Sequence, residues 1–214
     1  MDTTDLSVRA LESVGPDAIA ITFDTPGGFS AYPGQFVKLT LDTDDGEQSR
    51  FYTISSSDVD DTFEITVGID PDGEVAPLLA DLEPGDTVAV AGPFGDAYYE
   101  GHTDAVVLAG GPGVGPAVGI GERARDRSNG VAIVYQDQDP IHRGRLDELS
   151  ESGGFVRIVG DDADLDESVA AALDAVDATA QVFVYGFADF LDGAMDALER
   201  AGGDPEEAKV ENFG

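Results

Sequence analysis

The segment Arg50-Phe51-Tyr52-Thr53-Ile54-Ser55 brings a guanidinium, a phenol and a small hydroxyl into one short run. Its aromatic and β-branched content predicts a strand, with Arg50 and Tyr52 on one face and Phe51 and Thr53 on the other. A guanidinium suits a phosphate, an aromatic ring suits a flat heterocycle, and a hydroxyl suits a ring nitrogen. The segment therefore predicts a surface for a planar cofactor that carries phosphate. The alternative is a half-buried strand with a surface-paired arginine.

A glycine-rich string is the second candidate site. Gly110-Gly111-Pro112-Gly113-Val114-Gly115-Pro116 follows the apolar run Ala105–Ala109 and precedes a predicted helix, roughly Ala117–Arg127. Small residues let a backbone approach a pyrophosphate, and a helix N-terminus offers oriented N–H groups with a partial positive charge. Pro112 lacks a backbone N–H. The string predicts a dinucleotide site, and a turn that only permits close packing is the alternative.

Two further segments follow in a fixed order, Gly92-Pro93-Phe94-Gly95 and the terminal Glu211-Asn212-Phe213-Gly214. Together with Tyr32-Pro33-Gly34-Gln35-Phe36-Val37 and the two segments above, they resemble the ferredoxin–NADP reductase family of flavin-dependent oxidoreductases over nearly the whole chain. The resemblance implies an enzyme that passes electrons from NAD(P)H through bound FAD to ferredoxin, flavodoxin or a small acceptor. A flavin-binding electron-transfer or sensor subunit without efficient nicotinamide chemistry is the alternative function.

The resemblance assigns roles within the first segment. Arg50 is expected at the flavin phosphate, Tyr52 against the ring system and Thr53 near flavin N5, and Phe51, Ile54 and Ser55 complete the flavin-binding strand. In the terminal segment, Glu211 is expected to relay a proton or orient nicotinamide. Phe213 is expected either to cover the flavin ring or to dock a final strand.

The second phosphate-side segment departs from the family's pattern. The family has a G-x-[VC]-S turn there, whereas this chain has Gly73-Glu74-Val75-Ala76-Pro77 and lacks the hydroxyl. The backbone N–H groups of Val75 and Ala76 remain available for phosphate. We therefore expect Gly73, Val75 and Ala76 to bind the cofactor, with FAD favoured and FMN as the alternative.

On the nucleotide side, the resemblance implies that Gly110, Gly111, Gly113, Val114 and Gly115 bind NADH or NADPH. Where NADPH-binding relatives have serine and arginine, this chain has Asp137 and Gln138. A carboxylate repels a 2′-phosphate and accepts hydrogen bonds from a ribose hydroxyl, so NADH is favoured. Arg143 and Arg145 lie near enough in sequence to bind a 2′-phosphate instead.

The segment Tyr185-Gly186-Phe187 stands where relatives have Cys-Gly-Pro. Tyr185 is much larger than a cysteine, so it is expected to restrict the nicotinamide pocket, as a gate or by stacking on the flavin. The alternative is that it fills space left by smaller neighbours. Gly186 and Phe187 are expected to line the same site.

The formal net charge of −33 defines the surface, because 44 acidic residues face 11 basic ones. Such a surface repels nucleic acid and anionic lipid, so neither is an expected partner. The acids are scattered along the chain, which favours adaptation to a salt-rich cytoplasm over a patch for a basic partner.

Several classes of site are excluded by composition. The chain has no cysteine, which rules out disulfides and cysteine-ligated iron–sulfur clusters. Its two histidines lack ligand spacing, so no metal site is expected. No apolar run reaches the roughly 18–20 residues that cross a bilayer, and the acidic start does not resemble a signal peptide, so a cytoplasmic protein is expected.

The elements that position these residues fall into two predicted domains, 1–101 and 102–214. Short β-rich runs separated by Gly/Pro turns predict a six-stranded antiparallel flavin-binding barrel in the first. Buried apolar runs alternating with helical segments predict a doubly wound parallel sheet that binds nucleotide in the second. The expected strands are 7–11, 18–23, 35–41, 50–55, 62–69 and 87–91, then 105–109, 131–135, 155–159 and 182–185.

Overall fold

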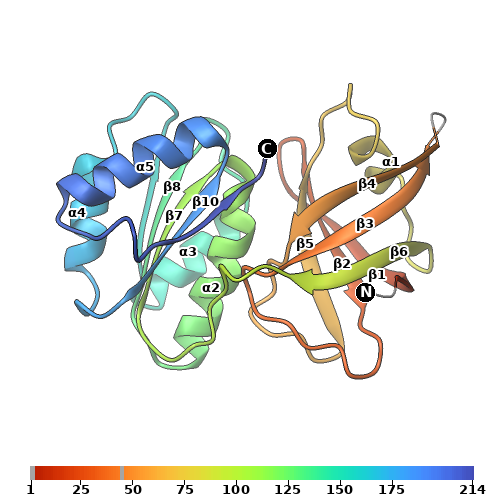
Figure 1. Cartoon of the computed structure of the whole chain (residues 1–214), viewed down its shortest axis with the longest axis horizontal. Helices are drawn as coiled ribbons and strands as arrows, with labels where there is room; N and C mark the ends of the chain where they lie inside the picture. The colour runs from red at the N-terminus through yellow and green to blue at the C-terminus, as the bar shows by residue number, and fades with distance from the viewer. Residues whose placement is uncertain (1–2, 44–45) are drawn as a thin grey trace.

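The computed structural model describes residues 3–43 and 46–214 and shows two bodies side by side (Figure 1). The N-terminal half forms a barrel of antiparallel strands. The C-terminal half forms a parallel sheet with helices on both faces. The predicted fold class is confirmed.

The barrel strands have the order β4-β3-β6-β1-β2-β5 within the described residues. An isolated bridge between Ile54 and Ile65 joins the two edge strands and closes the sheet. Alternate residues such as Ile21, Phe23 and Phe63 are fully buried inside, because strand side chains alternate between faces. The short helix α1 (Ala76–Ala80) covers one end. The strands are β1 (Thr4–Gly15), β2 (Ala18–Asp24), β3 (Phe36–Thr43), β4 (Gly46–Thr53), β5 (Thr62–Gly68) and β6 (Thr87–Phe94).

The second sheet is wholly parallel and has the order β11-β10-β7-β8-β9. Every residue of its central strand is buried, which explains the continuous apolar run that predicted it. Strand β11 was not among the expected runs, since it is short and carries charged residues. The strands are β7 (Ala105–Gly110), β8 (Val131–Gln136), β9 (Phe155–Val159), β10 (Gln181–Gly186) and β11 (Lys209–Asn212).

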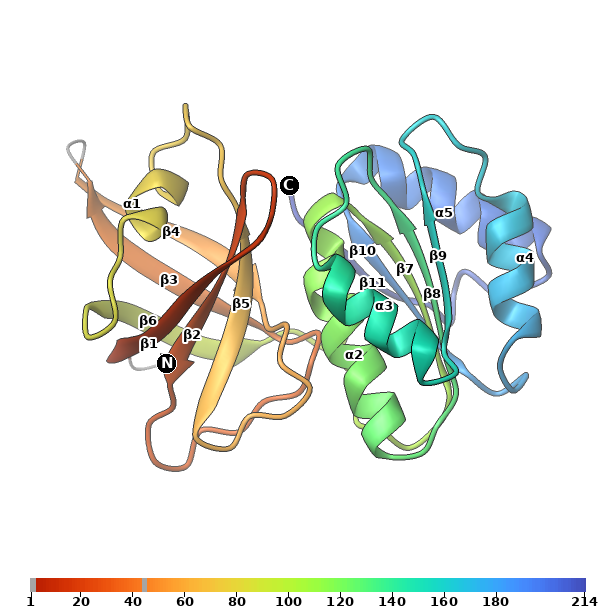
Figure 2. The same cartoon turned by 180° about the vertical axis from the view of Figure 1, so that it is seen from behind.

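Helices cover both faces of this sheet. Helices α4 (Asp166–Asp174) and α5 (Ala188–Arg200) lie on one face, and α2 (Val114–Asp126) and α3 (Arg143–Glu151) lie on the other (Figure 2). Helices α2 and α3 lie on the side of the sheet that faces the barrel.

Strand β7 has β8 on one side and β10 on the other. The chain reaches β8 through α2 and reaches β10 through α4, so the strand order reverses beside β7. Open α/β sheets bind ligands outside the carboxyl ends of strands at such a reversal. The predicted boundary between residues 101 and 102 falls in the crossing segment between β6 and β7 and stays a prediction.

Candidate functional site

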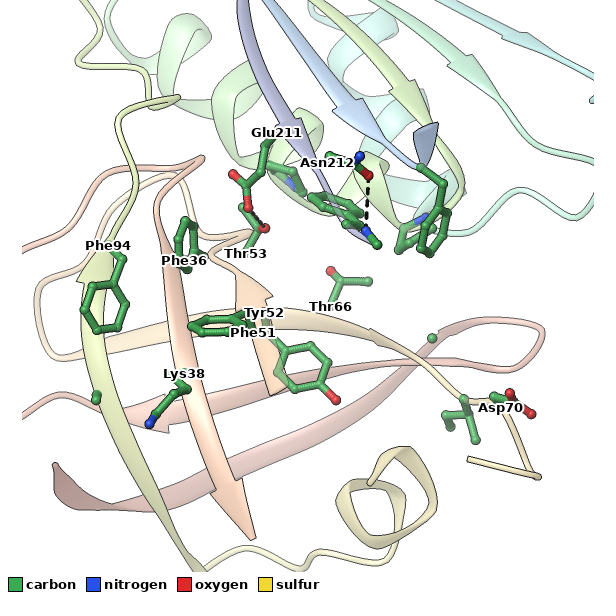
Figure 3. A pocket seen from close by; sticks show the side chains of 18 of the residues that line it. Phe36, Lys38, Phe51, Tyr52, Thr53, Thr66, Asp70, Phe94, Glu211 and Asn212 are labelled. Atoms are coloured by element: carbon green, nitrogen blue, oxygen red, sulfur yellow. Dashed lines mark hydrogen bonds between the residues drawn. The ribbon is translucent and has the colours of Figure 1, made fainter. Parts of the chain in front are cut away.

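A cavity of about 1130 Å³ lies where the barrel meets the carboxyl ends of the parallel strands. Its barrel wall comes from β3, β4, β5 and β6, and its other wall from Pro112, Pro116, Phe187 and the last four residues of the chain. Figure 3 shows these side chains converging on the space between the two bodies. The predicted flavin strand and the predicted terminal segment therefore face each other.

The barrel wall is built by the register of β3 with β4. Phe36 pairs with Thr53 and Lys38 pairs with Phe51, so side chains at alternate positions of both strands reach the cavity. The Phe36 and Phe51 rings meet edge to face at 5.5 Å. Phe36, which the sequence argument treated only as a barrel residue, thus lines the site. Strand alternation beside Phe51 was the signal that could have found Phe36 and Lys38.

Exposed aromatic rings form two sides of the cavity. Phe51 is 63% exposed and Phe187 is 52% exposed, although both are large and apolar. Phe187 also contacts Phe213 edge to face at 6.3 Å. Exposed rings gathered around one cavity indicate a flat apolar ligand, because their burial against it is favourable.

Thr53 and Glu211 connect the two walls. The Thr53 hydroxyl donates a hydrogen bond of 3.0 Å to Glu211 Oε1, and the residues are far apart in sequence (Figure 3). Glu211 Oε2 is buried and has no hydrogen-bond partner among the described residues. Burial raises the pKa of Glu211 to about 7, although the Thr53 hydrogen bond opposes the rise. A carboxyl with a free oxygen and such a pKa can hold or release a proton at the cavity wall.

Tyr52 packs against the barrel core and also reaches the cavity. Burial raises its pKa to about 12, an effect that the nearby Arg50 reduces, so the phenol stays protonated. Arg50 itself is half-exposed, and its guanidinium lies 4.0 Å from Glu74. Of the predicted strand, Ile54 and Ser55 are fully buried, and neither they nor Arg50 line the cavity. The predicted role of Arg50 at the flavin phosphate stays a prediction.

The turn before α1 lies beside Arg50 through Glu74, but Gly73, Val75 and Ala76 do not line the cavity. The Val75 side chain belongs to the barrel core. The predicted role of this turn in binding phosphate stays a prediction.

The glycine-rich turn lies at the carboxyl end of β7. Gly110 ends the strand, and Gly111 adopts a φ of +54°, which glycine tolerates at little cost. A Cβ atom at Gly110 or Gly186 would collide with the Phe190 ring, so both glycines allow close packing of α5. Within this string, Pro112 and Pro116 line the cavity, whereas Val114 is fully buried in the core.

Gly115 has a different neighbour from the one expected. A Cβ atom there would lie 2.8 Å from the Thr66 hydroxyl of β5, so Gly115 lets α2 contact the barrel. The packing alternative therefore accounts for Gly115, and its predicted contact with nucleotide stays a prediction.

Tyr185 does not restrict the cavity. Its side chain is fully buried, its ring stacks on Phe183 at 6.2 Å, and its hydroxyl donates to the Ala97 carbonyl. It lies in the core between β10 and α2 and is not among the cavity-lining residues. The structure favours the alternative, that Tyr185 fills space left by smaller neighbours such as Gly34, over the prediction that it gates the nicotinamide pocket.

Asp137 and Gln138 lie away from the cavity. The Asp137 carboxylate accepts hydrogen bonds from the Tyr135 hydroxyl at 2.9 Å and from the Asp139 N–H at 2.8 Å. Gln138 lines a second cavity, of about 530 Å³, together with Arg143. The structure does not bring these two residues beside Thr53 and Glu211, so their role in nucleotide choice stays a prediction.

Residues 5–99 match the family of oxidoreductase FAD-binding domains. The chain is 35% identical over 130 residues to a probable dihydroorotate dehydrogenase B (NAD(+)) electron transfer subunit of Methanopyrus kandleri, covering 61% of this chain and 47% of that protein. It is 29% identical over 229 residues to the ferredoxin reductase component of a 3-ketosteroid-9-alpha-monooxygenase of Mycolicibacterium smegmatis. That match covers 98% of this chain and 65% of that protein. The chain thus spans less than two thirds of the length of either relative.

The fold matches a crystal structure of a ferredoxin NADP+ reductase from Neisseria gonorrhoeae with bound FAD and NADP, with a TM-score of 0.80. That match covers the whole of both chains at 21% identity. The barrel matches FAD-binding oxidoreductase domains, and the two-domain fold is that of the ferredoxin NADP+ reductase structure. Together with the reductase-named relatives, these comparisons support a ferredoxin–NADP reductase-like flavin oxidoreductase.

The cavity residues fit a flavin. Phe51 and Phe187 offer apolar ring faces, Thr53 offers a hydroxyl, and Lys38 offers a cation on the barrel wall. The buried Glu211 Oε2 adds an unpaired acceptor or, when protonated, a donor. These are the kinds of group that a flavin ring and its phosphate need from a protein.

Proposed function

We propose that this chain is an FAD-dependent NAD(P)H oxidoreductase that favours NADH and passes electrons to a one-electron carrier such as ferredoxin or flavodoxin, or to a small acceptor. One observation carries the proposal: Thr53 and Glu211 meet across the two domains at the wall of a cavity of about 1130 Å³. Bound FAD would supply the chemistry of accepting a hydride and releasing electrons singly. The chain's part is to align the reactants and manage the proton.

The residues divide that work between the two walls. Arg50 and Lys38 supply cations for phosphate, and Phe51 and Tyr52 support the ring system. Thr53 holds Glu211 in place, and Glu211 takes or delivers a proton beside the cavity. Phe213 and Phe187 cover the open side and exclude water from it.

NADH is favoured over NADPH by the charge beyond β8. Asp137 keeps its carboxylate in a turn with Asp139, so a 2′-phosphate would enter a negative environment there. Arg145 is engaged by Glu122 and Glu64 and is therefore not free to bind that phosphate. Arg143 remains as the cation that would favour NADPH.

A flavin-binding electron-transfer subunit is the second candidate function. Pro112 lines the cavity where a backbone N–H would otherwise meet a pyrophosphate. Weak nicotinamide binding at that turn would leave a protein that exchanges electrons with partner proteins only.

Anaerobic titration of the FAD-loaded protein distinguishes the two. NADH should bleach the flavin absorbance within seconds, and NADPH should do so more slowly. The second function would be favoured if NADH left the flavin oxidised while both dithionite and a reduced carrier protein reduced it.

We also propose that the protein works in a salt-rich cytoplasm, from the charge of −33 and the scatter of its acids. No helix in the described part of the chain is long and apolar enough to cross a membrane. Screening of acidic self-repulsion should raise the melting temperature steeply between low and molar salt. A flat melting temperature over that range would contradict the proposal.

A further inference from the structure

Beside the cavity, helix α2 lies directly against the end of the flavin strand. A Cβ atom at Gly119 would lie 2.7 Å from the Ser55 carbonyl oxygen, and one at Gly115 would lie 2.8 Å from the Thr66 hydroxyl. Two small residues on one helix face thus let the nucleotide domain approach the barrel backbone to backbone.

Arg145, from the first turns of α3, spans this contact. Its guanidinium donates to both carboxylate oxygens of Glu122 on α2, at 2.7 and 2.8 Å. It also donates to Glu64 Oε1 on β5 at 2.8 Å and to the Ser55 carbonyl at 2.8 Å. One side chain therefore joins an acid of each domain and the backbone that follows Thr53.

The surrounding polar groups are paired as well. Ser55 Oγ donates to Glu64 Oε1 at 3.0 Å, and Thr66 Oγ1 donates to Ser55 Oγ at 3.1 Å. The His142 Nε2 atom lies 2.8 Å from Thr66 Oγ1. We call Arg145, Glu122, Glu64, Ser55, Thr66 and His142 the clamp.

A second buried arginine fastens α2 at the residue next to Glu122. Arg123 donates to the Ser57 carbonyl at 3.1 Å and to the Glu100 carbonyl at 3.2 Å. Loss of Arg145 would therefore remove one of two neighbouring ties between α2 and the segment that follows the flavin strand, and would let the nucleotide domain shift against the barrel.

We propose that Arg145 is a positioning residue that fixes the width of the cavity at Thr53 by locking the nucleotide domain to the flavin strand. The proposal rests on the proposed hydride transfer and names what sets its geometry. Ser55, which Arg145 binds, is two residues from Thr53, which contacts Glu211. A misplacement of about 1 Å can slow a reaction between aligned partners 10²-fold. We therefore expect the width of the cavity to affect the rate of flavin reduction and not the retention of flavin.

The test measures the distance between the domains directly. The chain has no cysteine, so Asp42→Cys on β3 and Asp192→Cys on α5, both exposed, take one spin label each. Pulsed electron resonance should give a narrow distance distribution for the FAD-loaded parent protein. Arg145→Ala should broaden it, and Arg145→Lys, which keeps the charge but not the four hydrogen bonds, should broaden it less.

The same preparations are mixed with NADH under anaerobic conditions. In Arg145→Ala the rate constant of flavin reduction should fall at least 10-fold while FAD content stays within twofold of the parent, and Arg145→Lys should recover part of the rate. Arg200→Ala is the matched control, because Arg200 pairs with Asp166 and Asp196 inside one domain and should change neither measurement. If Arg145→Ala does not fold, Glu64→Gln serves, since it removes one charge of the clamp and keeps its shape.

An unchanged distance distribution in Arg145→Ala, with reduction within twofold of the parent, would overturn the proposal. Parent protein that holds FAD but is not reduced by NADH would overturn the proposed function instead. In that case the distance distributions still decide whether Arg145 fixes the domains.

Discussion

The cavity and the clamp are neighbouring regions of one domain interface, and they are built in opposite ways. In the cavity, Glu211 Oε2 is buried without a partner among the described residues, and the Phe51 ring is mostly exposed. In the clamp, Arg145 makes four hydrogen bonds. His142 also stays neutral there, because burial and the Arg145 charge lower its pKa to about 3. The cavity therefore needs a ligand to satisfy its surface, whereas the clamp is complete within the protein.

The largest expected effect is the loss of folding stability when Tyr185, which does not line the cavity, is replaced. Its ring is fully buried in the core, so Tyr185→Ser should destabilise the protein by about 3–5 kcal/mol through loss of packing. Denaturant unfolding measures this change. Phe187→Ser is the control, since this exposed cavity residue should change stability by less than about 1 kcal/mol and weaken ligand binding instead. Faster flavin reduction in a fully stable Tyr185→Ser protein would return Tyr185 to the site.

The second prediction concerns the pH dependence that Glu211 contributes in FAD-free protein. Its pKa is about 7 in the folded state against an ordinary 4.5, so the folded state binds more protons between these values. The free energy of unfolding should therefore fall as pH rises from 4.5 to 7, by up to about 3 kcal/mol from this group. Glu211→Gln should remove that part of the slope.

The comparison with Glu211→Gln is needed because burial also raises the pKa of Glu64. Unfolding of both proteins at matched pH values isolates the Glu211 part. Identical slopes would show that Glu211 is an ordinary exposed carboxyl and would contradict its place at the cavity wall.

The third prediction tests the phosphate end of the flavin strand. Arg50→Ala should weaken FAD binding by about 1.5–3 kcal/mol, the range for hydrogen bonds to charged groups. Titration of the apoprotein with FAD gives the dissociation constant. Arg9→Ala is the control, because Arg9 forms a surface ion pair with Asp24 on the barrel. Equal dissociation constants for all three proteins would remove Arg50 from the site.

The sequence predicted the fold well because the patterns that indicate each strand lie within single short segments. The buried runs of β7 and β8 and the partial alternation in β2 and β5 follow directly from strand burial, and the order of motifs suggested the family that the comparisons support. The structure brings Thr53 and Glu211 together, and the roles that the resemblance implies for them at a flavin stay predictions.

The rest depended on contacts between distant segments. Both faces of β10 are covered, so its sequence could not tell which space would accept Tyr185. The Arg145–Glu64 ion pair joins residues 81 positions apart, and no pattern near Arg145 distinguishes a clamp from a phosphate ligand. The packing role of Gly115 could be seen only once the structure showed that α2 packs on Thr66.

Hydrogen exchange with and without FAD tests the difference between the cavity and the clamp most directly. The segments that hold the clamp and the Arg123 contact, 55–57, 64, 119–123 and 142–146, should exchange slowly in both states, because their contacts are complete within the protein. The cavity residues 51–53, 187 and 211–214 should become more protected when FAD is added. Protection of the clamp by FAD, with the cavity segments unchanged, would contradict the account.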